Sequence, residues 1–155
     1  MGTRERLRQA PSGRVKITAW GLMLGLGLGL AGGLANVSAT GRFWKSVQYT
    51  VDPTTHLIDY DNLRTMALQE RPKIIVAGAT AYPRQFDFQR IGEIAKESGA
   101  LFLADIAHIA GLIAGKAAQN PFDYGVDIMT TTTHKTLRGP RGGMILVRES
   151  EELAK

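Results

Sequence analysis

The sequence contains no cysteine, which excludes disulfide bonds and thiolate metal sites. A chain without disulfides is compatible with a reducing cytoplasm, and we expect the protein in that compartment. Aromatic residues make up only 7% of the sequence, and no stripe of basic residues is interleaved with them. We therefore expect no metal centre and no nucleic-acid partner.

Acidic residues are scarce near the N-terminus, and this scarcity explains the basic character of the chain. The net charge is +5 and the pI is about 9.7. Residues 1–16 carry a net charge of +4, which leaves +1 for residues 17–155. The globular part is nearly neutral, so the overall charge does not indicate binding to nucleic acid.

Charged residues are absent from positions 17–34, a segment rich in leucine and glycine. Its length approaches the roughly 20 residues that span a bilayer, and basic residues precede it, as in a targeting or anchoring segment. Its six glycines argue against a stable helix, since each costs about 1 kcal/mol relative to alanine in water. We expect no membrane anchor, and we treat residues 1–35 as a basic, Gly/Leu-rich segment apart from the domain that follows.

Strand and helix patterns alternate from residue 45 onward without an internal repeat, which predicts one α/β domain. Asp59 or Asp61 is expected to begin a helix that runs to about Glu70, and Asp87 to begin a second helix that Gly99 ends. Apolar runs predict buried strands of a mostly parallel sheet flanked by helices. These strands comprise residues 73–77, 101–104, 128–133 and 141–147, and residues 149–155 resemble the start of a further helix.

Polar side chains follow the predicted strands directly. Thr80 follows the first strand, Asp105 and His108 follow the second, and His134 and Lys135 follow the third. In open α/β sheets, ligands bind at the carboxyl ends of the strands. We therefore expect these residues, which are distant in the sequence, to converge on one edge of the sheet.

Lys135 stands after a run of threonines and just before a Gly/Pro turn. The run favours a strand and the turn ends it, so the lysine is expected at a strand exit. An amine held there, partly withdrawn from water, can attack a carbonyl carbon and form a Schiff base. The spacing of Lys135, Arg138 and Arg141 taken alone also fits a solvated basic loop.

The whole string TTTTHKTLRGPRGG (130–143) resembles the cofactor-lysine segment of serine hydroxymethyltransferases, a family of pyridoxal-phosphate enzymes. Other segments resemble that family in its usual order, and together they cover residues 36–149, about three quarters of the chain. These segments are NVSATG (36–41), VQYTVD (47–52), LIDYD (57–61), AGATAYPR (77–84) and DIAHIAGL (105–112).

The resemblance implies that residues 36–155 are an incomplete large domain of a fold-type-I enzyme that depends on pyridoxal 5'-phosphate. It also implies reversible transfer of the hydroxymethyl carbon of L-serine to tetrahydrofolate, which yields glycine and 5,10-methylenetetrahydrofolate. Full-length family members are expected to be homodimers or homotetramers. Two alternatives stay open: another fold-type-I aldolase or aminotransferase, and a truncated chain that binds ligands without turnover.

The resemblance assigns the main chemical roles to three residues. Lys135 matches the lysine that holds the cofactor as a Schiff base. Asp105 matches the aspartate that binds the protonated pyridine nitrogen and so keeps the ring an electron sink, although local sequence also fits a helix N-cap. His108 matches a histidine near the phenolic oxygen of the cofactor, whereas a lone histidine after a strand is more often a structural residue.

Four further residues are expected to contact the cofactor on the same grounds. His134 matches a histidine that lies against the cofactor phosphate, and Thr80 stands where the family has a hydrogen-bonding serine. Alternate side chains of a strand face opposite sides, so only part of the threonine run can reach the site, and Thr132 matches the threonine assigned to the cofactor. Arg141 either orients carboxylates or the phosphate, or braces its own loop.

Departures from the family pattern concentrate upstream of residue 36. The family has a loop there with a histidine that stacks on the cofactor ring, whereas no histidine precedes His56 in this sequence. A targeting segment, a native loop and an upstream reading-frame error each remain possible origins of residues 1–35. Family members are several hundred residues long, so we expect this chain to be an internal piece that does not turn over serine by itself.

Overall fold

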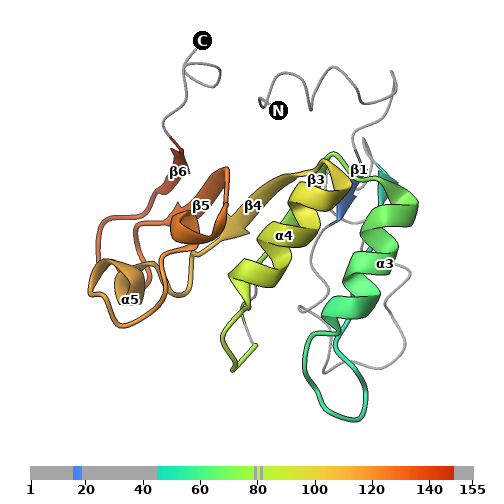
Figure 1. Ribbon diagram of the computed structural model, residues 1–155. Helices are drawn as coiled ribbons and strands as arrows, with labels where there is room; N and C mark the ends of the chain where they lie inside the picture. Colours follow the sequence, from blue (N-terminus) through green and yellow to red (C-terminus); the bar gives the residue numbers. More distant parts are fainter. Residues whose placement is uncertain (1–15, 19–44, 79, 81, 149–155) are drawn as a thin grey trace.

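The computed structural model describes residues 16–18, 45–78, 80 and 82–148 (Figure 1). Its centre is a six-stranded sheet with the order β2-β1-β3-β4-β5-β6, which confirms the α/β class predicted from the sequence. The predicted helix at 149–155 and most of the segment 1–35 lie outside the described residues. The strands are β1 (Lys16–Thr18), β2 (Lys45–Ser46), β3 (Ile74–Ala77), β4 (Leu101–Asp105), β5 (Ile128–Thr132) and β6 (Gly143–Val147).

Neighbouring strands of the sheet are parallel, except that β5 and β6 are antiparallel. Ala77 of β3 aligns with Ala104 of β4, and Ala104 aligns with Met129 of β5. The carboxyl ends of these three strands therefore meet at one edge of the sheet, as the sequence predicted. The predicted strands agree with β3, β4, β5 and β6 to within two residues at each end.

Two helices, α3 (Tyr60–Glu70) and α4 (Phe88–Ser98), begin after aspartates, as predicted. The side chain of Asp59 accepts a hydrogen bond from an amide of the first turn of α3 at 2.9 Å. Asp87 does the same for α4 at 3.0 Å. These carboxylates satisfy amides that the start of a helix leaves unpaired. Asp61, the alternative start, lies inside the first turn of α3 instead.

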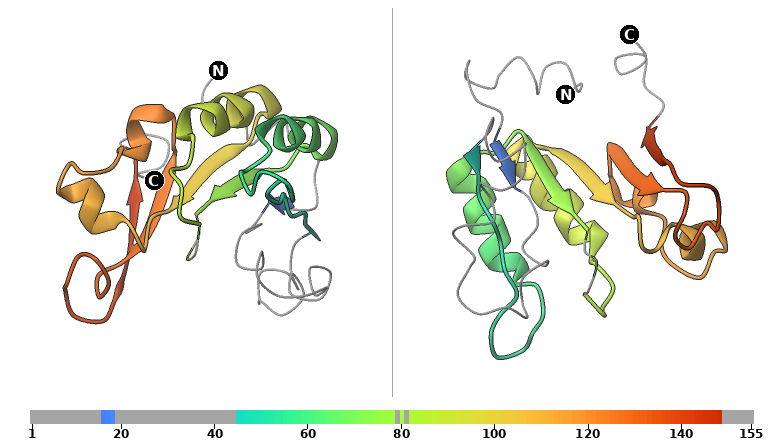
Figure 2. Two further views of the ribbon diagram at one scale, coloured as in Figure 1. Left: turned by 90° about the horizontal axis from the view of Figure 1, so that it is seen from below. Right: turned by 180° about the vertical axis from the view of Figure 1, so that it is seen from behind.

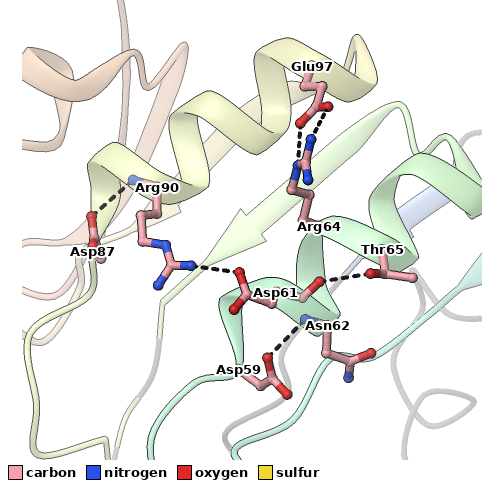
Figure 3. Close-up of polar contacts among 8 residues, drawn as sticks. All are labelled: Asp59, Asp61, Asn62, Arg64, Thr65, Asp87, Arg90 and Glu97. Carbon is pink, nitrogen blue, oxygen red and sulfur yellow. Dashed lines mark hydrogen bonds and ion pairs between the residues drawn. The ribbon is translucent and has the colours of Figure 1, made fainter.

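Helices α3 and α4 lie side by side on the same face of the sheet (Figure 2). On their outer side, Arg64 pairs with Glu97 at 2.6 Å and Arg90 pairs with Asp61 at 2.8 Å (Figure 3). All four side chains are exposed, so each ion pair contributes little to stability. The packing of the two helices therefore depends on the apolar residues beneath them.

The core lies between the sheet and these two helices. Leu63 of α3, Ile91 of α4, Ile75 of β3 and Phe102 of β4 are completely buried in it. Because side chains alternate along a strand, Phe102 faces the helices while Asp105, three residues later, faces the opposite side of the sheet. The polar end of β4 is thus turned away from the core.

Two short helical segments connect β4 to β5, namely α5 (Ala110–Ala114) and the 3-10 helix η1 (Pro121–Tyr124). The side chain of Asn120 accepts a hydrogen bond from the Phe122 amide at 3.2 Å and so begins η1. In the part of the chain that the structure describes, no helix is long and apolar enough to cross a membrane.

Tyr49 connects the segment before α3 to the sheet. Its ring is buried, and its hydroxyl donates to the carbonyl oxygen of Val76 in β3 at 3.0 Å. Burial raises the pKa of the Tyr49 hydroxyl well above its usual range, and the neighbouring Tyr60 raises this pKa further. The folded protein therefore holds the Tyr49 proton more tightly than the unfolded chain does.

The free energy of unfolding is expected to fall at alkaline pH because of Tyr49. The unfolded chain loses this proton near pH 10 while the folded chain keeps it, so the stabilisation is complete below about pH 10 and is lost as the pH rises further. Urea midpoints at about pH 8 and about pH 10.5 should differ less in Tyr49→Phe than in the wild type. Burial also raises the pKa of Tyr60, so Tyr49→Phe is expected to keep part of the pH dependence. Equal pH dependence in both proteins would contradict the prediction.

Candidate active site

Asp105 is the last residue of β4 and lies at the edge where the parallel strands end. It aligns with Thr130 of β5, and the Ile106 amide donates to the carbonyl oxygen of Thr130 at 2.9 Å. The backbone on both sides of Asp105 is therefore fixed to β5. This pairing holds Asp105 beside Thr130, the first residue of the threonine run.

The carboxylate of Asp105 does not cap a helix. Its Oδ1 accepts a hydrogen bond from the Ala107 amide at 3.0 Å, whereas the cap position of α5 is Ile109, which makes no side-chain capping bond. Gly78, just after β3, lies against Asp105 so closely that a Cβ there would come within 2.7 Å of the Asp105 Cβ. A short local turn and a close backbone neighbour thus orient the carboxylate.

Lys135 and His108 are joined by a hydrogen bond. The distance between Lys135 Nζ and His108 Nε2 is 3.1 Å, and both residues are half-buried. An ammonium group can only donate, so with Lys135 in that form Nε2 of His108 is the acceptor and the ring proton of His108 is on Nδ1. Side chains that follow two different strands are thereby brought into direct contact.

The loop that carries Lys135 is closed by its own backbone. The Gly139 amide donates to the carbonyl oxygen of Thr133 at 2.7 Å, and the Thr133 amide donates to that of Gly142 at 3.1 Å. The Arg138 amide donates to the carbonyl oxygen of Lys135 at 3.0 Å. Lys135 therefore sits in a turn of defined shape rather than in an open basic loop.

Two buried polar atoms near Lys135 have no hydrogen-bond partner in the described part of the chain. They are Oγ1 of Thr132 and Nδ1 of His134. Asp105 and Thr130 are aligned, and Thr132 lies two residues beyond Thr130, so Thr132 projects from the same face of the sheet as Asp105. Buried polar groups are normally paired, so orphaned ones indicate a place that a ligand can fill.

A family model described as serine hydroxymethyltransferase matches residues 17–155. The chain belongs to the serine hydroxymethyltransferase family. The serine hydroxymethyltransferase of Hyphomonas neptunium is 53% identical over 136 residues, which are 86% of this chain and 31% of the relative. Serine hydroxymethyltransferase 2 of Pseudomonas fluorescens is 48% identical over 136 residues, or 86% of this chain and 32% of the relative. Serine hydroxymethyltransferase 1 of Pseudomonas aeruginosa is 47% identical over 142 residues, or 90% and 34%.

Serine hydroxymethyltransferases are fold-type-I enzymes that depend on pyridoxal phosphate, and the sheet and helices described above are part of the α/β domain of that fold. The chain spans about a third of the length of the curated relatives it matches. The matched region begins at residue 17, upstream of the segments that carried the resemblance.

The family resemblance also predicts Thr80 and Arg141 as cofactor contacts. Both residues are exposed. Thr80 follows β3, and Arg141 lies in the turn before β6. Within the described ranges Arg141 makes no hydrogen bond or ion pair, and its role stays a prediction. No group of metal-ligating side chains occurs in these ranges, and the expected absence of a metal site stays a prediction.

Sequence reasoning missed one contact of the site. The amide of Gly111 in α5 donates to Oγ1 of Thr136, the residue after Lys135, at 2.9 Å. The available signal was the glycine itself, because a glycine inside a short apolar helix costs about 1 kcal/mol and usually has a packing reason. The residue that lies against it, however, is Thr136 in the loop after β5, which the sequence around Gly111 does not indicate.

Replacing Thr132 by valine keeps the side-chain shape and removes an orphaned hydroxyl. An unsatisfied buried polar group costs about 1 to 3 kcal/mol, so Thr132→Val is expected to raise the free energy of unfolding by about 1 kcal/mol. Thr131→Val is the matched control, because Oγ1 of Thr131 donates to the carbonyl oxygen of Thr132 at 3.3 Å and its removal should not stabilise. Urea unfolding without added ligand measures both. A less stable Thr132→Val protein would mean that the hydroxyl is already paired.

Proposed function

We propose that this chain supplies the cofactor-holding part of a glycine hydroxymethyltransferase, which converts L-serine and tetrahydrofolate to glycine and 5,10-methylenetetrahydrofolate. The observation that carries the proposal is the pair of orphaned buried atoms, Thr132 Oγ1 and His134 Nδ1, beside a lysine that is held by His108. These groups leave donors and acceptors for a polar ligand next to an amine. That combination fits pyridoxal phosphate, which carries both an aldehyde and a phosphate.

In this proposal, five residues of the chain would hold the cofactor. Lys135 would bind it covalently through its amine, as a Schiff base, and the carboxylate of Asp105 would pair with the ring nitrogen. His134 and Thr132 would satisfy their unpaired atoms on the polar groups of the cofactor, and His108 would lie near the phenolic oxygen. Thr80 and Arg141 are exposed, so their contacts with the cofactor require a ligand that extends to the surface of the loop.

The bound cofactor supplies an electron sink for the bond that breaks at the amino acid. The chain's own groups prepare this chemistry by handling protons. Nε2 of His108 accepts the hydrogen bond of the Lys135 ammonium and can take its proton, which leaves a neutral amine for attack on an aldehyde carbon. The carboxylate of Asp105 would hold a proton on the ring nitrogen of a bound cofactor, because a carboxylate stabilises a neighbouring cation.

Substrates and assembly follow from the family and belong to the proposal. Serine, glycine and folate are the small-molecule ligands, and a homodimer or homotetramer in the cytoplasm is the assembly of the full-length family member. About two thirds of each relative has no counterpart in this chain. Exchange of the glycine α-proton that depends on folate separates this function from another aldolase or an aminotransferase of the same fold, which has no use for folate.

Lys135 is expected to be the single site of stable attachment for pyridoxal phosphate. Incubation of the chain with pyridoxal phosphate, reduction with borohydride and peptide mapping should place the label on Lys135. Lys135→Ala should lose this label and the accompanying cofactor absorbance, while Lys116→Ala, which changes an exposed lysine after α5, should keep both. Labelling that is spread evenly over Lys116 and the other exposed lysines would refute the assignment.

Asp105→Asn is expected to retain covalent attachment at Lys135 but to weaken reversible binding of pyridoxal phosphate. Hydrogen bonds to charged groups contribute about 1.5 to 3 kcal/mol, which corresponds to a loss of affinity of about tenfold to a hundredfold. Asp127→Asn, at the residue just before β5, is the matched control, because Oδ2 of Asp127 accepts from the Phe102 amide at 2.9 Å and serves the fold. Spectrophotometric titration measures the affinity. Equal affinities in Asp105→Asn and the wild type would leave Asp105 only its bond to the Ala107 amide.

A further inference from the structure

Two contacts join the segment after β4 to the loop after β5. The first is the hydrogen bond of 3.1 Å between the side chains of His108 and Lys135. The second is formed three residues further along the first segment, where the Gly111 amide donates to Oγ1 of Thr136 at 2.9 Å. Lys135 and Thr136 are consecutive, so the second contact fixes the backbone from which the Lys135 side chain extends.

The second contact requires glycine. A Cβ on Gly111 would come within 2.7 Å of the carbonyl carbon and 2.9 Å of the Cβ of Thr136. Carbon atoms pack best at about 3.5 to 4.0 Å, so an alanine would push the two segments apart by about 1 Å. The atoms that it meets belong to the backbone or lie next to it, so no side-chain rotation can relieve the contact.

Neither segment can absorb this displacement by itself. On one side, two backbone hydrogen bonds hold α5. The Ile113 amide donates to the carbonyl oxygen of Ile109 at 3.0 Å, and the Gly115 amide donates to the carbonyl oxygen of Gly111 at 2.9 Å. On the other side, Thr136 lies inside the turn closed by the bond of 3.0 Å between the Arg138 amide and the Lys135 carbonyl oxygen. A shift of Thr136 must therefore move Lys135 as well.

We propose that Gly111 is a positioning residue for Lys135: its lack of a side chain lets α5 approach Thr136 and sets the distance between the Lys135 amine and His108. The inference rests on the proposed role of Lys135 as the amine that binds the cofactor. The three atoms nearest to a Cβ on Gly111 all belong to Thr136 and none to Lys135. It acts through the backbone of Thr136.

The test compares Gly111→Ala with a glycine that has room for a Cβ. Gly143 is the matched control, since the nearest atom to a Cβ there is the Thr131 carbonyl oxygen at 3.7 Å, an ordinary contact. The first readout needs no cofactor. Nuclear Overhauser effects between the ring of His108 and the side-chain methylene protons of Lys135 should be equally strong in the wild type and in Gly143→Ala, and clearly weaker in Gly111→Ala.

The second readout is the ratio of labelling at Lys135 to labelling at the exposed Lys96 of α4, after limited treatment with pyridoxal phosphate and cyanoborohydride. A misplacement of about 1 Å can cost a large factor in rate, so the ratio should fall at least about tenfold in Gly111→Ala and stay within about twofold in Gly143→Ala. Lys96 serves as an internal reference within the same molecule.

A second pair of variants keeps the test decisive if Gly111→Ala does not fold. Thr136→Val removes the hydroxyl acceptor without adding volume and should weaken both readouts, whereas Thr136→Ser keeps the acceptor and should preserve them. The positioning role would be overturned if the Overhauser effects and the labelling ratio were unchanged in Gly111→Ala. If Gly111→Ala does not fold, the same result in Thr136→Val would overturn it. A wild type that shows the His108–Lys135 contact but no preferential labelling of Lys135 would count against the proposed function, while the Overhauser effects still decide the role of Gly111.

Discussion

The register between β3, β4 and β5 is the constraint on which the candidate site depends. Ala77, Ala104 and Met129 lie in one row on the face that the helices cover, so the residues that follow these strands share one edge. A slip of β5 by one residue would exchange its two faces, turning Thr131 toward the site and Thr132 toward the core. Burial of Met129 beneath the helices opposes such a slip.

Backbone hydrogen bonds extend this order beyond the strands. The loop after β5 is closed by the bonds between Thr133 and both Gly139 and Gly142, and the segment after β4 becomes α5 within a few residues. Each of these segments is stiff, so their relative position is set where they touch. The two segments touch at two contacts, Gly111 with Thr136 and His108 with Lys135. The second contact includes the Lys135 amine.

Features that depend on local bonds could be predicted from the sequence. The helix starts at Asp59 and Asp87 arise from side chains that accept from amides a few residues ahead, so the residue type and its position suffice. The four strands followed from apolar runs between turn residues. The site residues were selected by family resemblance, because local patterns left a helix cap open for Asp105 and a solvated loop open for Lys135.

Contacts between distant segments could not be predicted in this way. The distance between Lys135 and His108 depends on the path of the loop after β5, which includes Arg138 in the left-handed region at φ 57, a conformation that no sequence pattern indicated. The exposure of Thr80 and Arg141 likewise depends on how their loops leave the sheet. Neither property is encoded in the spacing of residue types.

The two faces of β5 have different roles, one in the stability of the fold and the other in the candidate site. Met129 and Thr131 project toward the core, where Met129 is packed and the hydroxyl of Thr131 has an acceptor. Thr132 projects to the other face, where its hydroxyl is buried without a partner among the described residues. An unpaired buried group lowers the stability of the protein without ligand, and that cost is recovered when a ligand pairs with it. The β-branched run therefore builds one strand whose inner face stabilises the fold and whose outer face gains stability only through binding.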